Sequence, residues 1–360
     1  MHKFSKNLLK IKFHTHNYFM KNFSKSIFLI TAILFCAIFC ACRTSQIQGG
    51  HQAQGSASTA KIANWNLQTF FDATPCGTEY SGFTAKDKSW TEQKYTERLE
   101  KLCRVISSID ADILCLEEIE NSAIIYDIVN NYAFQARSDK AYNYACFAGE
   151  KNQAFGLAIL SRYPILDYST HQIDIRSEPT SQPQTRPVLN AKILVGQKIL
   201  SLYACHWKSK SGGQEKTEIW RDYQEAQLAN LISHDTDFVF ACGDFNRDLT
   251  EFTIIQTDNT DFVELSAHKK LFYESSSVKL NSAWLSEIGK NFYATEGSYF
   301  YKDTWSKIDH FFYSDNILLT DFCTIKTQDN ATAEGKPYRY SVWNGTGASD
   351  HLPISCRIEF

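Results

Sequence analysis

Short apolar runs that end at polar side chains recur along residues 60–360, and they restrict the fold more than any other feature. Most have the length of buried strands and are too short for helices. They lie at residues 62–66, 113–116, 144–148, 155–160, 188–195, 199–205, 238–241, 308–313 and 354–358. We expect one helix that follows a capping box at Ser89 and Glu92 and runs to Ile109, and a second at residues 216–233, each between strands. Residues 250–300 are assigned to loops and one or two short helices. This pattern predicts two sheets with helices packed outside.

The first 42 residues read as a secretion signal preceded by a segment with no interpretation of its own. From Met20, two lysines precede an apolar stretch at residues 27–39, which is short for a membrane span. Small residues then lead to Cys42 in a pattern that resembles a bacterial lipobox. Cleavage by an ordinary signal peptidase and an uncleaved anchor are the alternatives. We expect translation from Met20 and a lipoprotein exported to the bacterial cell envelope, held at a membrane through the lipid on Cys42, on the outer surface or the periplasmic face.

The remaining chain divides into a tether and one catalytic domain. Residues 43–59 are mostly Gln, Gly, Ser, Thr and Ala and cannot bury enough apolar surface to fold. Residues 60–360 show no repeat and no second linker. The net charge of −3 excludes a uniformly basic nucleic-acid coat protein, but not an enzyme that meets nucleic acid through a metal. The cysteines after Cys42 have neither zinc nor redox spacing, so we expect mostly free buried thiols, with one disulfide as the alternative.

Carboxylates at the ends of the runs indicate a metal and phosphate chemistry. Hard cations such as Mg²⁺ prefer carboxylate oxygens, and Glu118 follows a strand-like run. A surface glutamate is the alternative, because Glu117 and Glu120 flank it. Asp309 is suited to orient His351 as a general base, with Asp350 beside it near the metal, although an Asp-His pair is more often a loop turn.

Two further clusters suit a phosphate substrate. Gly243 permits a sharp turn, and alternation places Asp244 and Asn246 on one side, where they could position a water; an Asx turn is the alternative. His206 also ends a run, and Lys208 and Lys210 follow it. A histidine there can donate to phosphate while the lysines guide an anionic backbone, but a buried histidine with exposed lysines fits equally.

The order of these motifs resembles the endonuclease/exonuclease/phosphatase superfamily, which has the DNase I-like fold. The resemblance rests on Gly-Asp-Phe-Asn at residues 243–246, Ile-Asp-His at 308–310 and Ser-Asp-His-Leu-Pro at 349–353, and it covers nearly all of residues 60–360. It implies an α+β, four-layer αββα sandwich of two mainly antiparallel sheets with helices outside. It also implies a divalent cation, Mg²⁺ with Mn²⁺ or Ca²⁺ as alternatives.

The same resemblance implies roles for individual residues. Metal binding falls to Glu118, with Asn66 and Asp350 near it. The implied catalytic residues are His206, Asp244, Asn246, Asp309 and His351, and either Asp244 or His351 takes the proton of the water. Substrate contacts are expected from Arg186, Lys208 and Lys210. The chain departs from many relatives at Glu117, where they have glutamine, and from some at Gln68, where a carboxylate would support a second metal.

We therefore expect a monomeric, Mg²⁺-dependent phosphodiesterase that acts on DNA or RNA, because the segment at residues 206–210 is similar to secreted bacterial nucleases of this superfamily. A sphingomyelinase or an inositol-phosphate phosphatase of the same superfamily is the alternative. A sphingomyelinase would carry an exposed aromatic hairpin, and residues 290–305 are rich in aromatic residues without a clean hairpin pattern. An inactive surface adhesin or scaffold is disfavoured, since no member of the polar set is missing.

Overall fold

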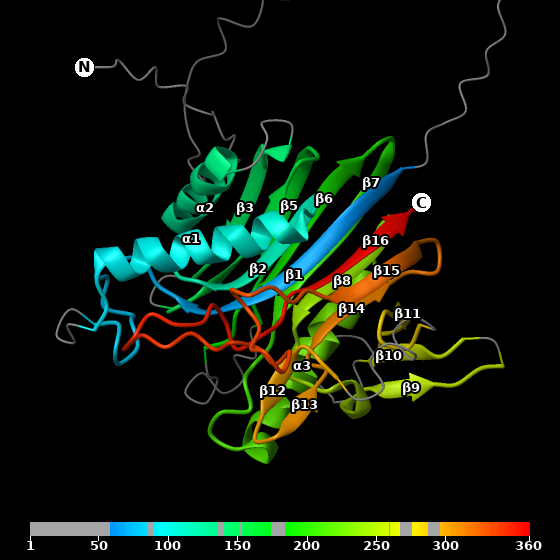
Figure 1. The fold of residues 1–360 in the computed structure, drawn as a ribbon. Coiled ribbons are helices and arrows are strands. Elements are labelled where there is room, and N and C mark those ends of the chain that lie inside the picture. Colours follow the sequence, from blue (N-terminus) through cyan, green and yellow to red (C-terminus); the bar gives the residue numbers. More distant parts are fainter. Residues whose placement is uncertain are drawn as a thin grey trace, which may run out of the picture. The chain divides into compact units, whose positions relative to one another are not determined.

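The computed structural model describes residues 58–84, 89–135, 140–150, 153–173, 184–258, 260–266, 276–286 and 296–360. Their strands form two large sheets and one small two-stranded sheet (Figure 1). The predicted signal, Cys42 and nearly all of the predicted tether lie outside the described residues.

The first sheet has six strands, and its only parallel pair joins β1 to β2. Its order is β15 (Leu318–Thr324), β16 (Ile354–Glu359), β1 (Thr59–Phe70), β2 (Ile113–Ile119), β4 (Gly156–Ser161) and β3 (Tyr144–Ala148).

The second sheet has eight strands, and its only parallel pair joins β7 to β8. Its order is β5 (Ile165–His171), β6 (Val188–Val195), β7 (Lys198–His206), β8 (Phe238–Asp244), β14 (Asp309–Tyr313), β11 (Ser277–Ser282), β10 (Phe262–Ser266) and β9 (Thr253–Ile255). The apolar runs at residues 188–195 and 199–205 form the antiparallel β6–β7 hairpin. A separate hairpin pairs β12 (Tyr299–Tyr301) with β13 (Thr304–Ser306).

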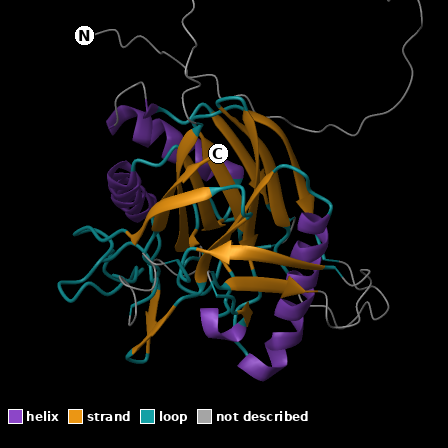
Figure 2. Ribbon diagram, turned by 90° about the vertical axis from the view of Figure 1, so that its right-hand side faces the viewer, coloured by secondary structure: helices purple, strands orange, loops and turns teal. Residues whose placement is uncertain are grey.

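Alternation along the strands creates the layers. In β1, Ile62 points into the core shared by the two large sheets, whereas Ala63 and Trp65 point to the core beneath the helices α1 (Glu92–Ile109) and α2 (Ser122–Gln135). On the other side, α3 (Gln214–Ser233) contacts β10 and β11. Figure 2 shows helices on both outer sides of the strands. The predicted α+β sandwich with helices outside is confirmed.

Three local predictions need correction. The described residues between 250 and 300 include the strands β9, β10 and β11, preceded by one 3₁₀ turn at Leu249–Glu251, where we predicted loops and short helices. The alternation of Val263 with Leu265 carries the strand signal there, because both side chains are buried on one face. Helix α2 was not predicted. Helix α1 begins at Glu92, and its cap is Thr91, which accepts a hydrogen bond from the Lys94 backbone amide, and not Ser89 as predicted.

The cysteines of the described part agree with the expected mostly free, buried thiols. All eight cysteines after Cys42 are free, and six of them are buried. None of the helices in the described segments is both long and apolar enough to cross a membrane.

Candidate active site

Sheet topology brings the predicted polar residues to one edge of the two sheets. Because β7 and β8 are parallel, His206 pairs in register with Asp244 at their carboxyl ends, and antiparallel β14 places Asp309 opposite Asp244. In the other sheet Asn66 of β1 pairs with Glu117 of β2. Strand β16 runs antiparallel to β1, so the segment that precedes it also lies at this edge.

Close strand approach and bulges shape this edge. A Cβ atom on Gly243 would lie 1.8 Å from the carbonyl oxygen of Cys205, so only glycine allows β8 to lie this close to β7. Strand β2 has a bulge at Glu118, which has a left-handed φ of 60°, and β1 has one at Gln68 and Thr69. The Thr69 amide donates to Glu118 Oε2 at 2.5 Å. The two bulges thus turn the Glu118 carboxylate away from the ladder and fix it.

Four side chains meet at the centre of the site. Asn66 Nδ2 donates to Asp244 Oδ2 at 3.1 Å and lies 3.4 Å from Glu118 Oε1. His206 Nε2 lies 3.6 Å from Asp244 Oδ2 and 3.8 Å from Glu118 Oε1. The backbone amide of Asn246 donates to Asp244 Oδ1 at 2.8 Å. Oxygen-rich and partly buried, this cluster suits a hard divalent cation and a phosphoryl group.

A histidine–carboxylate dyad borders this cluster. His351 Nδ1 lies 2.8 Å from Asp309 Oδ2, and both residues are buried. The Ser298 hydroxyl donates to the same carboxylate oxygen. On the other side of the ring, His351 Nε2 lies 3.8 Å from Asp244 Oδ2. The dyad therefore fixes one nitrogen of His351 and presents the other to the centre.

Burial and neighbouring charges shift the pKa values of these groups in different directions. Burial alone disfavours a charged His351, but the charge and hydrogen bond of Asp309 outweigh it and hold the pKa of His351 well above its ordinary value. Burial, with the nearby cation of Arg186, holds the pKa of His206 well below its ordinary value. Burial raises the pKa of Asp244 to about 7, against the attraction of His351. At neutral pH His351 is thus a cation and His206 a neutral hydrogen-bonding group.

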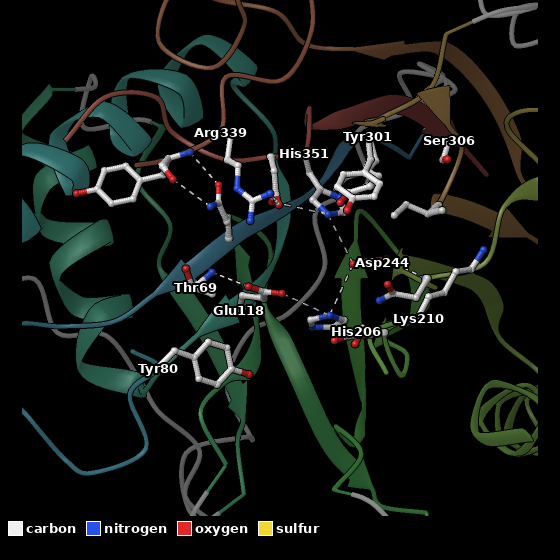
Figure 3. A pocket seen from close by; sticks show the side chains of 18 of the residues that line it. Thr69, Tyr80, Glu118, His206, Lys210, Asp244, Tyr301, Ser306, Arg339 and His351 are labelled. Atoms are coloured by element: carbon white, nitrogen blue, oxygen red, sulfur yellow. Dashed lines mark hydrogen bonds and ion pairs between the residues drawn. The ribbon is translucent and has the colours of Figure 1, made fainter. Parts of the chain in front are cut away.

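These groups line a cleft with a volume of about 1150 Å³. Glu118, His206, Asp244 and His351 lie at its floor, and Tyr80 and Tyr301 lie on opposite sides of them (Figure 3). The site is therefore open to a ligand much larger than a single phosphate.

Main-chain contacts brace the segment that carries His351 against β1. The Ser349 hydroxyl donates to the Asn66 carbonyl at 2.6 Å, and Trp65 Nε1 donates to the His351 carbonyl at 3.0 Å. These bonds couple residues more than 280 positions apart in the chain. They explain why the terminal Ser-Asp-His cluster, which alone resembles a turn, belongs to the site.

The remaining predicted residues lie around the centre, and they differ in whether they line the cleft and whether another side chain already binds them. Asp350 lines the cleft, and Asn246 donates from its side chain to the Trp207 carbonyl at 3.1 Å. Lys210 also lines the cleft, but its ammonium is paired with Glu251 at 2.6 Å. Arg186 and Lys208 are half-buried beside the cleft and are not among its lining residues.

The structure adds residues that local sequence could not identify. Arg339 lines the cleft with its side chain 65% exposed, and its Nη1 lies 3.8 Å from Asp350 Oδ2. The ring of Tyr299 lies 4.8 Å from that of His351. Gln68 exchanges two side-chain hydrogen bonds with the backbone of Tyr340, so its amide is not available to a second cation. Only the aromatic richness of residues 290–305 hinted at Tyr299.

Glu117 is the second position, besides Gln68, at which this chain differs from the family pattern, and the difference has a structural consequence. Its side chain is fully buried, and neither oxygen has a hydrogen-bond partner among the described residues. Burial, together with the charges of Asp309 and Asp244, raises its pKa well above the ordinary value. The neutral form of this carboxyl group is therefore favoured, at a position where the family resemblance implies a glutamine in many relatives.

Comparison with known proteins agrees with this geometry. Residues 61–359 match the family model described as endonuclease/exonuclease/phosphatase family. A humanized D. rerio TDP2 structure is 15% identical with a TM-score of 0.52, covering 84% of this chain and 100% of that one. The human Nocturnin catalytic domain with bound sulfate is 16% identical with a TM-score of 0.50, covering 84% and 95%. ANGEL2, a 2′,3′-cyclic phosphatase in complex with adenosine-2′,3′-vanadate, is 13% identical with a TM-score of 0.52, covering 84% and 96%. No curated protein matches the sequence.

Proposed function

Because the chain belongs to the endonuclease/exonuclease/phosphatase family, and is therefore a metal-dependent phosphoric ester hydrolase, we propose that it is a nuclease that cleaves phosphodiester bonds of DNA or RNA. The observation that carries the proposal is the convergence of Glu118, Asp244, His206 and the Asp309–His351 dyad at the floor of a wide cleft. A cleft of about 1150 Å³ has room for nucleotides on both sides of a scissile phosphate.

The residues present fit a divalent cation, and we propose Mg²⁺. Glu118 Oε1 has only long contacts among the described residues, at 3.4 Å from Asn66 Nδ2 and 3.8 Å from His206 Nε2, and both Glu118 and Asp350 line the cleft. These are the hard oxygen donors that Mg²⁺ prefers. When bound there, the cation would neutralise negative charge on the phosphoryl oxygens.

The protein's own groups would carry the proton transfers and the charge. Asp244, fixed by Asn66 and Asn246, is placed to orient the attacking water and accept its proton. Asp309 accepts from Nδ1 of His351 and holds the pKa of the ring well above its ordinary value, which favours a proton on Nε2 as well, so His351 would stabilise the phosphoryl charge and not act as the base. Neutral His206 would donate a hydrogen bond to a phosphoryl oxygen.

The β12–β13 hairpin bears on the sphingomyelinase alternative. Its tip is Lys302-Asp303, and Phe300 and Trp305 on one face are half-buried against each other. A hairpin that enters a membrane would expose apolar side chains at its tip, so this one favours a soluble anionic substrate over lipid.

Incubation of the purified protein with plasmid DNA and with RNA in Mg²⁺ tests the proposal. We expect nicking or degradation that stops with EDTA and falls at least 100-fold in His351→Ala. Phosphocholine release from sphingomyelin vesicles, or phosphate release from inositol phosphates, provides the comparison. Activity on those substrates without hydrolysis of either nucleic acid would contradict the nuclease proposal.

Export and lipid anchoring remain part of the proposal. They rest on residues 20–42 alone, which lie outside the described residues. Metabolic labelling with palmitate in a bacterial host should label the protein, and Cys42→Ala should abolish the label. An unlabelled protein recovered in the cytosolic fraction would rule out the anchor.

A further inference from the structure

A row of aromatic rings leads from the catalytic centre to the cleft rim. The ring of Tyr299 lies 4.8 Å from that of His351, and a backbone bridge also joins the two residues. The ring of Tyr301 stacks beside Tyr299, with centroids 6.3 Å apart and planes at 25°. Tyr301 lines the cleft and is 54% exposed, whereas half of the aromatic side chains in the described part are buried. The exposed ring of Tyr301 is therefore separated from His351, one of the proposed catalytic groups, by the ring of Tyr299 alone.

The hairpin beneath these rings is braced. Alternation along β12 places Tyr299 and Tyr301 on one face and Phe300 on the other. Phe300 packs against Trp305 of β13 with centroids 5.1 Å apart, and the ammonium of Lys336 lies 4.2 Å from the Phe300 centroid. These contacts fix the back of the hairpin, so the exposed face of Tyr301 is held before any ligand arrives. A ring already in place loses little conformational entropy when it binds.

Charge and a second ring accompany Tyr301 around the cleft. The ammonium of Lys302 lies 5.4 Å from the Tyr301 centroid on an exposed side chain, so it can leave the ring and pair with a phosphate. Arg339 presents an exposed guanidinium on the same cleft. Tyr80, 48% exposed, lies across the catalytic groups from Tyr301 (Figure 3). Aromatic faces with nearby cations are the surface that unpaired nucleotides bind.

We propose that Tyr301 is a stacking platform for the nucleobase adjacent to the scissile phosphate, and that it makes the enzyme select single-stranded nucleic acid. The proposal rests on the proposed nuclease function. In a duplex both faces of each base are covered by its neighbours, so a base can reach Tyr301 only from an unpaired strand or a frayed end. The Tyr299–Tyr301 row would then align that base while its phosphate lies beside His351.

Kinetics on matched substrates tests this inference. The purified protein, Tyr301→Ala, Tyr301→Phe and the control Tyr126→Ala would be assayed with Mg²⁺ on a single-stranded oligonucleotide and on the same sequence as a blunt duplex. Tyr126 is an exposed tyrosine on α2, outside the cleft residues. We expect the wild type to prefer the single strand and Tyr301→Ala to raise KM for it about 5- to 150-fold. Tyr301→Phe keeps the ring and should retain wild-type KM, as should Tyr126→Ala.

A binding experiment separates stacking from a general loss of structure. In EDTA, which stops hydrolysis, a fluorescent oligothymidylate and a fully abasic strand of equal length would be titrated with each variant. Tyr301→Ala should weaken binding of the oligothymidylate by a similar factor and leave the abasic strand unchanged. Equal weakening on both strands would overturn the stacking assignment.

The outcomes distinguish the inference from the function on which it rests. Absence of any Mg²⁺-dependent hydrolysis of DNA or RNA by the wild type removes the proposed function and this inference with it. Hydrolysis in which Tyr301→Ala equals Tyr126→Ala, or in which duplex is preferred, overturns the inference and leaves the nuclease intact. If Tyr301→Ala weakens binding to sphingomyelin vesicles and not to the oligonucleotide, the hairpin is a membrane contact and the inference fails.

Discussion

Substitution of Arg98 would test how the fold positions the site. Arg98 lies on α1 with its side chain fully buried, and no carboxylate pairs with it among the described residues. Its Nη2 donates to the carbonyl oxygens of Leu67 and Gln68 at 2.6 and 2.5 Å and lies 3.2 Å from that of Ala348. Its Nη1 donates to the Thr69 carbonyl at 3.1 Å. One guanidinium thus holds the bulged end of β1 to the segment that precedes the Asp-His cluster.

The magnitude follows from these four bonds and from the burial of the charge. Burial lowers the pKa of Arg98 to about 10, so the side chain stays charged at pH 7. A hydrogen bond from a charged donor contributes about 1.5–3 kcal/mol, and the face of the Tyr340 ring lies 3.8 Å from the guanidinium carbon. Removing the charge also removes its desolvation cost, so the bonds do not add. We expect Arg98→Met to lower the free energy of unfolding by about 3–5 kcal/mol.

The assay is urea unfolding followed by circular dichroism and tryptophan fluorescence, with Arg104→Ala as the control. Arg104 lies on the same helix but pairs with Asp329 at the surface, with its side chain 47% exposed, so its loss should cost less than about 1 kcal/mol. Because Thr69 fixes Glu118, Arg98→Met should also lower kcat in conditions where the protein stays folded. A loss for Arg98→Met no larger than that for Arg104→Ala would refute the reasoning.

Three further outcomes follow from the site. Asp309→Asn removes the charge that keeps His351 protonated, so kcat should fall about 100-fold or more. The limb of the pH–rate profile that reports the titration of His351 should also move to lower pH. An unchanged profile would show that the Asp309–His351 dyad does not act in catalysis. EDTA should abolish activity and Mg²⁺ restore it, and Glu118→Gln should raise the Mg²⁺ concentration for half-maximal rate at least tenfold, so an unchanged requirement would place the cation elsewhere. Burial lowers the pKa of His310 to about 4, so folding excludes a proton that the unfolded chain binds below pH 6.5. Stability should fall by about 3 kcal/mol from this group between pH 6.5 and 4, and urea unfolding at both pH values should show a smaller fall in His310→Gln.

Much of the fold was predictable because it depends on local periodicity. Strand β8 is an apolar run that ends at Gly243, and the sequence shows both the strand and the turn. Strands β9 to β11 were missed because they are short and their faces are unevenly buried, so that packing against α3 and β14 defines them more than pattern does.

The site residues likewise divide into positions that local pattern identifies and contacts that only packing decides. Strand-end positions such as His206 and Asp244 were recognised because parallel strands bring their carboxyl ends to one edge. Lys210 looked free in the sequence, yet Glu251 binds its ammonium from 41 positions away. That pairing could not be foreseen, because an ion pair between distant segments leaves no local pattern.

By itself, the sequence determined which side chains are available for the chemistry and on which kinds of element they lie. Spacing within a strand or turn is a local property, so Asp350 and His351 can be recognised as a catalytic cluster from their neighbours and from the other motifs. Only the tertiary structure decided that Arg98 holds two distant segments together and that Tyr301 stands exposed next to Tyr299, whose ring contacts that of His351. Both depend on contacts between residues far apart in the chain, and such contacts arise only when the sheets have packed.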